Sequence, residues 1–251
     1  MKYKLLVLDV DGTLVESNPE AIPNKKIVEA IKKISKRIKI SLCTGRSFPS
    51  TDKIIEILSI QGNYHVIESG AKILTPLGKF ENIKSLNYEN VEEIINLSGT
   101  TPLRYGYCVN GKWTDILKKN NKETITVLTA HSANDNQTKA ILSKLEPLNN
   151  TFNIFTGSKW NSPTGSVIHI TNKESSKESG IRYIQNKLNI LKEETIGIGD
   201  MYNDLPLFKA VGLKVAMGNG TEELKKQADI VAPPLKEDGV AWVIEKYLIA
   251  N

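Results

Sequence analysis

The first seventy residues alternate between short apolar runs and amphipathic segments, a pattern typical of strands that alternate with helices. Residues 5–8 form a continuous apolar run, which predicts a strand buried on both faces. Pro23 is expected to open a helix, because Ile27, Ile31 and Ile34 recur on one helical face. The next predicted elements are a strand, a helix and a strand at residues 38–43, 54–58 and 64–67. This order predicts a parallel sheet with right-handed crossovers.

From about residue 71 the pattern changes to that of a small α+β unit. Residues 73–80 predict a hairpin that turns at Pro76–Gly78. Strands are then expected at residues 105–109, 124–128, 152–155 and 167–170, and helices at 91–97 and 137–145. Asp135 lies at the expected capping position of the second helix. We therefore predict that residues 84–171 are an inserted domain.

The alternation of helix and strand resumes after the insertion. The remaining predicted elements, in order from helix to helix, are residues 181–188, 195–198, 205–210, 213–216, 221–226, 229–231 and 239–248. Residues 1–83 and 172–251 are thus expected to form one α/β core with a doubly wound, Rossmann-like parallel sheet.

Composition and charge agree with an ordinary globular protein. The 251 residues are 40% hydrophobic and 24% charged, and the formal net charge is +5. The basic residues Lys32, Lys33, Lys36, Arg37 and Lys39 gather near the end of a predicted amphipathic helix. We interpret them as a solvated helix face and expect no nucleic-acid partner, because no nucleic-acid motif or interleaved aromatic residue accompanies them.

Two further observations bear on compartment and cofactors. The only cysteines, Cys43 and Cys108, form no CxxC pair, which argues against a zinc site or a disulfide framework. The apolar run at the start stops at Asp9, too early for a signal peptide, and no run approaches the length of a membrane span. We expect a cytoplasmic protein without a membrane partner, either a monomer or a homodimer.

Polar residues follow several predicted strands, at the sheet edge where open parallel sheets bind ligands. Asp9 and Asp11 follow the first strand, Thr44, Gly45 and Arg46 the second, and Asp200, Asn203 and Asp204 the strand at 195–198. Carboxylates brought together from separate strands repel one another unless a cation lies between them, and Mg²⁺ prefers such hard oxygen ligands. A phosphate bound there would need further positive charge, which Lys177 could supply.

Four segments together resemble the motifs of the haloacid dehalogenase-like phosphatases. They are Asp9-Val10-Asp11-Gly12-Thr13, Thr44-Gly45-Arg46, Lys177 and Gly199-Asp200-Met201-Tyr202-Asn203-Asp204, in the family's order. The insertion between the second and third motifs lies where the Cof-type, or type IIB, subgroup carries its C2 cap. Ala216-Met217-Gly218-Asn219 is also similar to a segment of that subgroup.

The resemblance implies a role for each matching residue. Asp9 would attack phosphorus and become an aspartyl-phosphate, and Asp11 would act as acid and then as base. Thr44 and Lys177 would hold the phosphoryl group, which Gly45, Arg46, Asn203 and Asn219 would also help to bind. The residues implied in the Mg²⁺ site are Asp9, Asp11 (through its backbone carbonyl), Asp200 and Asp204.

These residues predict a Mg²⁺-dependent phosphomonoester hydrolase that acts on a small phosphorylated metabolite. Ser69-Gly70-Ala71 replaces the Asn-Gly-Ala of many relatives, and Glu178 follows Lys177 where glycine is common. The context of Lys177 resembles archaeal-type phosphoglycolate phosphatases, while sugar-phosphate phosphatases share the architecture. Two alternatives stay open: a phosphotransferase of the phosphomutase type, and a non-enzymatic receiver-like phospho-acceptor, which would be much shorter.

Overall fold

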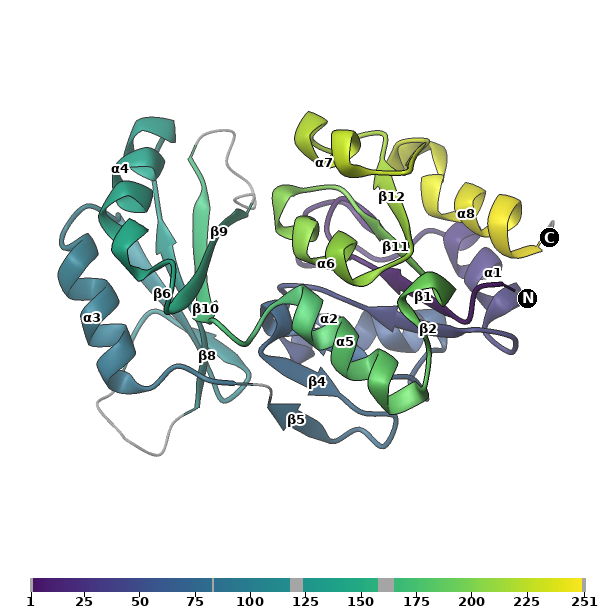
Figure 1. Cartoon of the computed structure of the whole chain (residues 1–251), viewed down its shortest axis with the longest axis horizontal. Coiled ribbons are helices and arrows are strands. Elements are labelled where there is room, and N and C mark those ends of the chain that lie inside the picture. Colours follow the sequence, from purple (N-terminus) through teal and green to yellow (C-terminus); the bar gives the residue numbers. More distant parts are fainter. Residues whose placement is uncertain (1, 83, 118–123, 158–164, 250–251) are drawn as a thin grey trace.

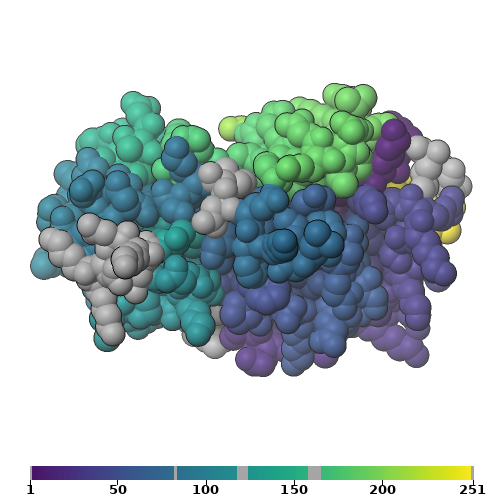
Figure 2. Space-filling view, turned by 90° about the horizontal axis from the view of Figure 1, so that it is seen from below, coloured from purple at the N-terminus to yellow at the C-terminus, as the bar shows by residue number. Residues whose placement is uncertain are grey.

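The structure is a computed structural model that describes residues 2–82, 84–117, 124–157 and 165–249. Two lobes lie side by side in both views (Figures 1 and 2). We call the lobe with the central parallel sheet the core. The other lobe, made of α3, α4 and β6–β10, is the cap.

The core sheet contains five parallel strands in the order β13-β12-β11-β1-β2. Their bounds are β1 (Leu5–Leu8), β2 (Lys39–Leu42), β11 (Thr195–Gly199), β12 (Leu213–Met217) and β13 (Ile230–Ala232). The chain builds outward from β1 to β2 and later from β11 to β13. The strand order therefore reverses between β1 and β11, and ligands bind at such a switch point in open α/β sheets. The predicted doubly wound sheet is confirmed.

Helices cover both faces of this sheet, because side chains alternate across each buried strand. Leu6 and Leu8 pack towards α1 (Lys25–Ile34), α2 (Phe48–Leu58) and α8 (Gly239–Ile244), whose last turn continues as a π-helix over Glu245–Ile249. Leu5 and Val7 pack on the opposite face. The helices there are α5 (Lys177–Leu188), α6 (Leu205–Ala210) and α7 (Glu222–Gln227).

A small antiparallel sheet extends the core beside β2. It consists of β3 (His65–Ile67), β4 (Lys72–Leu74) and β5 (Phe80–Asn82), and it includes the predicted hairpin. A parallel bridge between Cys43 and Val66 joins it to the end of β2. His65 strengthens this join: its Nδ1 accepts a hydrogen bond from the Leu42 N–H at 3.1 Å, and its Nε2 lies 3.1 Å from the Ile60 carbonyl. His65 is thus a buried structural histidine.

The cap is a five-stranded antiparallel sheet with two helices on its outer face (Figure 1). Its strands, in the spatial order β7-β6-β8-β10-β9, are β7 (Lys112–Thr114), β6 (Arg104–Val109), β8 (Ile125–His131), β10 (Val167–Asn172) and β9 (Phe152–Gly157). Ile168 and Ile170 pack under α3 (Tyr88–Ser98) and α4 (Asp135–Leu145). His169 alternates with them, so its side chain lies on the sheet face towards the core.

Two connections join the lobes, and they run side by side. Ser175 Oγ donates to the Lys84 carbonyl at 2.7 Å, and Asn172 Nδ2 donates to the Ser85 carbonyl at 3.3 Å. Asn153 Nδ2 lies within 3.0 Å of three carbonyls of the returning connection, those of residues 172, 173 and 175. These bonds fix the turn that leads into α5. The predicted domain boundaries near residues 84 and 171 stay predictions.

Several predicted element ends are wrong by a few residues. Helix α1 begins at Lys25 with Asn24 as its N-cap, so Pro23 precedes the helix instead of opening it. Asn134 caps α4, and Asp135 is its first residue. Helix α5 begins at Lys177, four residues before the predicted start, because its polar first turn carries no apolar periodicity. The sequence does not predict strand β7, because its three residues, Lys112, Trp113 and Thr114, are too few to show an alternation of apolar and polar positions.

The basic run near the end of the first helix lies on the surface. All five residues of the basic run between Lys32 and Lys39 are exposed, as expected for a solvated helix face. Within the described ranges, no helix combines the length and apolarity that a bilayer crossing requires. Both cysteines are buried and free.

Candidate active site

Asp9 lies just beyond β1, at the switch point of the core sheet. Its N–H donates to the Ile198 carbonyl of β11 at 3.0 Å, and the residue is only 4% exposed. Gly12, at φ +80°, turns the following loop back over the site. A Cβ there would lie 2.0 Å from a carboxylate oxygen of Asp200, so only glycine fits this approach. Thr13 Oγ1 donates to Asp200 Oδ1 at 3.3 Å, which links the loops after β1 and β11.

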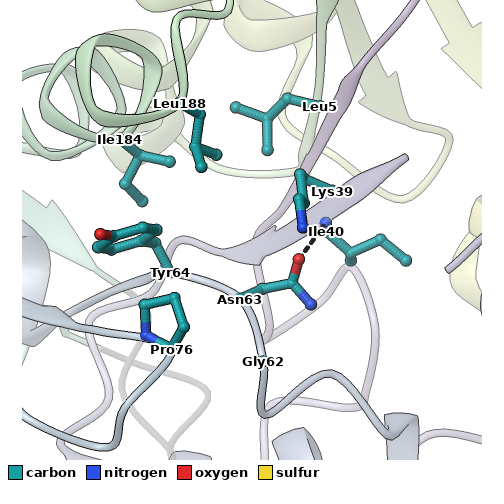
Figure 3. Close-up of a pocket in the computed structure, with 9 residues that line it drawn as sticks. All are labelled: Leu5, Lys39, Ile40, Gly62, Asn63, Tyr64, Pro76, Ile184 and Leu188. Carbon is teal, nitrogen blue, oxygen red and sulfur yellow. Dashed lines mark hydrogen bonds between the residues drawn. The ribbon is translucent and has the colours of Figure 1, made fainter. Parts of the chain in front are cut away.

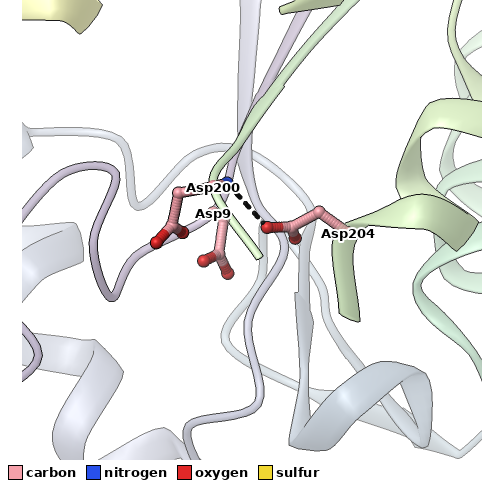
Figure 4. Close-up of side chains that lie close together, drawn as sticks. All are labelled: Asp9, Asp200 and Asp204. Atoms are coloured by element: carbon pink, nitrogen blue, oxygen red, sulfur yellow. Dashed lines mark hydrogen bonds between the residues drawn. The ribbon is translucent and has the colours of Figure 1, made fainter. Parts of the chain in front are cut away.

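Three buried carboxyl groups converge at this point (Figure 4). Asp9, Asp200 and Asp204 each offer an oxygen, and the three oxygens lie within 4.8 Å of one another. Asp204 is held from behind, because its Oδ2 accepts the backbone N–H groups of Asp200 and Met201 at 2.9 and 3.1 Å. These hard oxygen donors fit a Mg²⁺ ion, which usually takes one or two carboxylates together with water and phosphate.

Lys177 is the cation of this cluster. Its Nζ lies 2.7 Å from Asp9 Oδ1 and 2.6 Å from Asp204 Oδ1, and the residue is 3% exposed. Lys177 is the first residue of α5, and the Ser176 side chain caps that helix. Gly70 lets the chain pass close to this cap, since a Cβ at Gly70 would lie 2.1 Å from the Ser176 carbonyl oxygen.

The cluster has more carboxyl groups than positive charges, and this imbalance shifts the pKa values of its members. Burial raises the pKa of Asp9 to about 7, and the nearby Asp204 adds to the rise. Burial, followed by the charges of Asp9 and Asp204, raises the pKa of Asp200 to about 9. Burial alone would lower the pKa of Lys177, but Asp204 and Asp9 outweigh it and raise that pKa. Three carboxyl groups thus face one lysine, and a divalent cation would supply the missing positive charge.

Asp11 lies apart from the three-carboxyl cluster and pairs with Arg46. Arg46 NH2 and Nε donate to Asp11 Oδ1 and Oδ2 at 2.6 and 2.9 Å, a two-point contact. Arg46 is 3% exposed and also donates to the carbonyls of Asn18 and Pro19 at 2.8 and 3.3 Å. The structure therefore places Arg46, which the sequence suggests for phosphate binding, in direct contact with the Asp11 carboxylate.

The loops after β2 and β3 form the neighbouring wall. Thr44 is buried, and its Oγ1 accepts the Arg46 N–H at 3.1 Å. The Thr44 N–H donates to the Val66 carbonyl, and its carbonyl accepts the Ser69 N–H at 3.0 Å. A Cβ at Gly45 would lie 3.3 Å from Ser69 Oγ, so the two loops are in close contact. Thr44, Gly45 and Ser69 thus share one edge of the site.

Asn203 and Asn219 lie in different settings. Asn203 lines a cavity together with Lys177, and its buried Oδ1 has no hydrogen-bond partner among the described residues. Asn219 is engaged at both ends of its amide. Its Nδ2 donates to the Gly12 carbonyl at 2.9 Å, and its Oδ1 accepts the Leu235 N–H at 2.8 Å. The structure thus places Asn219 as a tie between the loops after β1 and β12.

The cavity beside Lys177 has a volume of about 350 Å³ and lies between the lobes. The core contributes Ser69, Ser176, Lys177, Asn203 and Pro206, and the cap side contributes Asn149, Phe152, Asn153, Ile154, Phe155 and Lys173. The sequence singles out none of these cap residues for function, because none of them belongs to a motif. A hollow of about 40 Å³ lies at the opposite end of the core sheet, near Leu5 and Lys39 at the amino ends of β1 and β2 (Figure 3). It is remote from the carboxyl cluster.

Comparison with known proteins places this geometry in a family. A model of the haloacid dehalogenase-like hydrolases matches residues 6–244, nearly the whole chain. The chain belongs to this family. The resemblance that the four motifs predict is therefore confirmed.

Several relatives of this hydrolase cover nearly its whole length. Among them are a "Phosphoglycolate phosphatase" of Staphylothermus marinus, 24% identical over 98% of both chains, and a "Phosphoglycolate phosphatase 1" of Saccharolobus solfataricus, 27% identical over 98% of this chain and 96% of the relative. A solved haloacid dehalogenase-like hydrolase from B. subtilis superimposes with a TM-score of 0.84 at 20% identity, covering 98% of this chain and 100% of that one. A solved subclass IIB sugar phosphatase gives 0.77 at 21% identity, covering 97% and 98%. The family and its relatives agree on a haloacid dehalogenase-like phosphatase.

Proposed function

We propose that this protein is a Mg²⁺-dependent phosphomonoesterase that uses Asp9 as its nucleophile. The observation that carries the proposal is the buried cluster of Asp9, Asp200, Asp204 and Lys177 at the switch point. Nucleophile, cation and metal-type ligands meet there within hydrogen-bond reach. Covalent catalysis by a carboxylate divides one difficult displacement into two easier steps.

In the first step a carboxylate oxygen of Asp9 attacks phosphorus, and the bond from phosphorus to the ester oxygen breaks. Asp11 gives its proton to the departing oxygen, so an alcohol leaves and an aspartyl-phosphate remains. In the second step Asp11 takes a proton from water as that water attacks phosphorus, which releases phosphate and restores Asp9. Arg46 contacts both oxygens of the ionised Asp11 carboxylate, which is the form that acts as base in the second step, and one of these contacts would remain when the other oxygen carries the proton for the first step.

The other residues bind and orient the phosphoryl group. Lys177 and Thr44 lie at its side of the site and would stabilise the charge that develops on its oxygens. Mg²⁺, when bound by Asp9 and Asp200, would neutralise charge on the phosphoryl oxygens. Asp204 keeps Lys177 in place and binds the backbone at Asp200, which gives it a supporting role.

The substrate is a small phosphorylated metabolite, either a sugar phosphate or phosphoglycolate. A cavity of about 350 Å³ suits a ligand of this size. Its lining includes Asn203, whose buried Oδ1 has no hydrogen-bond partner among the described residues, and a substrate hydroxyl could donate to that oxygen. Glycolate carries only a carboxylate once its phosphate has been bound. We therefore expect polyol and sugar phosphates to be hydrolysed faster than phosphoglycolate.

The test is release of inorganic phosphate from a panel of sugar phosphates, glycerol phosphate and phosphoglycolate with Mg²⁺. Asp9→Asn is expected to lower turnover by at least about a thousandfold while the fold persists, because removal of a covalent nucleophile leaves only binding and electrostatic catalysis. Asp229→Asn, an exposed aspartate paired with Lys214, is the matched control and should keep full activity.

The same panel separates the alternatives. Substantial turnover by Asp9→Asn would exclude Asp9 as nucleophile. Turnover that requires a sugar bisphosphate would instead indicate a phosphomutase. Accumulation of a stable phospho-protein without turnover would favour a receiver-like function.

A further inference from the structure

The segment after β3 is strained. Glu68, Ser69 and Gly70 all have positive φ, at 52°, 57° and 99°. Glycine adopts this region freely, but each non-glycine residue held there carries a cost, which persists only where the surroundings fix the conformation. The contacts around residues 68–70 must therefore hold this backbone conformation in place.

The backbone of this segment is hydrogen-bonded to the loop after β2, which contains Thr44 and Arg46. The Glu68 N–H donates to the Arg46 carbonyl at 2.9 Å, and the Ser69 N–H donates to the Thr44 carbonyl at 3.0 Å. The left-handed turn points both N–H groups towards the loop. Any movement of Glu68 is therefore transmitted to Arg46, whose side chain holds Asp11.

The Glu68 side chain points the other way, into the cap. It is fully buried, and its Oε2 accepts a hydrogen bond from Thr126 Oγ1 of β8. Lys72 Nζ lies 3.5 Å from the same oxygen. Gly111, in the turn between β6 and β7, covers the pair: a Cβ there would lie 3.6 Å from Glu68 Oε1 and from Lys72 Nζ.

This burial depends on the cap lying against the core as it does in the structure. The core supplies Glu68 and Lys72, whereas Thr126 and Gly111 belong to the cap, so opening would return the pair to water. A buried carboxylate loses hydration, and its partners must compensate for that loss. Glu68 Oε1 has no hydrogen-bond partner among the described residues, which makes the Thr126 hydroxyl the main compensation from the cap.

We infer that Glu68 is a positioning residue that couples cap closure to the orientation of Asp11. This inference rests on the phosphatase reaction proposed above. When the cap closes, Thr126 fixes the Glu68 carboxylate. The Glu68 N–H then fixes the Arg46 backbone, and the Arg46 fork aligns Asp11 for proton transfer. When the cap opens, Glu68 is released and the alignment is lost, so acid–base catalysis operates only in the closed, water-excluded state.

The test is Thr126→Val, which removes the hydroxyl at nearly constant volume. Loss of a hydrogen bond to a buried charged group should lower kcat/KM for glycerol phosphate by about tenfold or more. Thr126→Ser keeps a hydroxyl and should restore most of the activity. Thr138→Val is the matched control, because its hydroxyl bonds only within the cap, to Asn134 and Ser132, among the described residues. It should leave kcat/KM unchanged.

A comparison of leaving groups tests the link to Asp11. p-Nitrophenolate departs without a proton, whereas an alkoxide needs one. Thr126→Val should therefore lower kcat/KM much less for p-nitrophenyl phosphate than for glycerol phosphate. An equal loss for both substrates would overturn the coupling to Asp11.

The distance between cap and core can be measured without measuring catalysis. Spin labels at Lys36→Cys in the core and Lys139→Cys in the cap, both exposed positions, report the distance between the lobes. Thr126→Val should shift that distance towards a longer, open population, and an unchanged distribution would overturn the role of Thr126 in closure. If the unsubstituted enzyme hydrolyses no phosphomonoester, the proposed function fails, but the label distances still decide whether Thr126 holds the cap closed.

Discussion

At the scale of single residues, the pairing of Arg46 with Asp11 has the most direct consequence for catalysis. Two guanidinium nitrogens contact the two oxygens of one carboxylate, at 2.6 and 2.9 Å. This geometry requires a planar fork, which lysine lacks. The pair is therefore sensitive even to a change that conserves charge.

We predict that Arg46→Lys lowers kcat/KM by about 10- to 100-fold through misalignment of Asp11. Because we propose that Arg46 orients Asp11 and does not bind the phosphoryl group, inhibition by inorganic phosphate should change little. Steady-state kinetics with product inhibition measures both quantities. Arg182→Lys, in an exposed pair with Glu178, is the control. A large loss of phosphate affinity in Arg46→Lys would instead place Arg46 on the substrate.

The sequence predicts which residues are near the site but not all of their partners. Asp9, Thr44, Lys177 and Asp200 follow strand ends or carry motif spacing, so their convergence can be anticipated. The partner of Arg46 depends on how the loop at residues 9–15 folds back, and no local pattern encodes this. The same holds for the contact of Glu68 with Thr126, which are 58 positions apart in the chain.

At the scale of elements, His65 joins β3 to β2 as a neutral imidazole. Burial lowers its pKa to about 4, below its ordinary value of 6.5. The unfolded chain therefore binds a proton more readily than the folded one. The contribution to stability is fully present above pH 6.5 and is lost progressively as the pH falls from about 6.5 towards about 4.

We predict that this loss amounts to about 3 kcal/mol of unfolding free energy over that interval. Urea unfolding at a series of pH values measures it. His65→Gln keeps a donor and an acceptor but cannot take up the proton, so the difference between the two proteins isolates His65. Parallel pH dependences for both proteins would contradict the assignment.

Helix α4 tests which residue serves as an N-cap. Asn134 accepts the Gln137 N–H at 2.9 Å, whereas Asp135 lies inside the first turn. Asn134→Ala should lower the unfolding free energy by about 1 kcal/mol. Asp135→Ala should cost less, about 0.5 kcal/mol, since it loses only a charge near the helix dipole. Urea unfolding of the two variants shows which substitution costs more unfolding free energy. A larger cost for Asp135→Ala would indicate that Asp135 is the N-cap residue.

Element positions were largely predictable, whereas element ends were not. Buried runs such as residues 5–8 and 195–198 carry strong apolar signals, so their strands are found within a residue or two. The first turn of α5 is polar, because it carries Lys177 towards the carboxyl cluster instead of packing on the core. Its helical periodicity becomes visible only from Ile181 onward.

At the scale of the whole molecule, the unbalanced charge of the site links metal binding to stability. The buried carboxyl groups of Asp9, Asp200 and Asp204 repel one another unless they are protonated or bound to a cation. A ligand that binds only the folded state stabilises it by mass action.

We predict that Mg²⁺ at about a hundredfold excess over its Kd raises Tm by about 5–10 °C, and that EDTA abolishes both the shift and the activity. Asp200→Asn removes one ligand and should remove most of the Mg²⁺-dependent shift. Na⁺ at matched ionic strength controls for general salt effects. A Tm that is independent of Mg²⁺, together with activity in EDTA, would exclude the metal site.

The neighbouring connections at Lys84 and Ser175, joined by a hydrogen bond of 2.7 Å, have an evolutionary consequence. A lobe whose chain departs and returns at one point can be exchanged as a unit without disturbing the strand order beneath it. Sequence variation in the cap can then redirect the enzyme to new metabolites while the carboxyl cluster stays the same. The attachment thus allows substrate range to diverge independently of the chemistry.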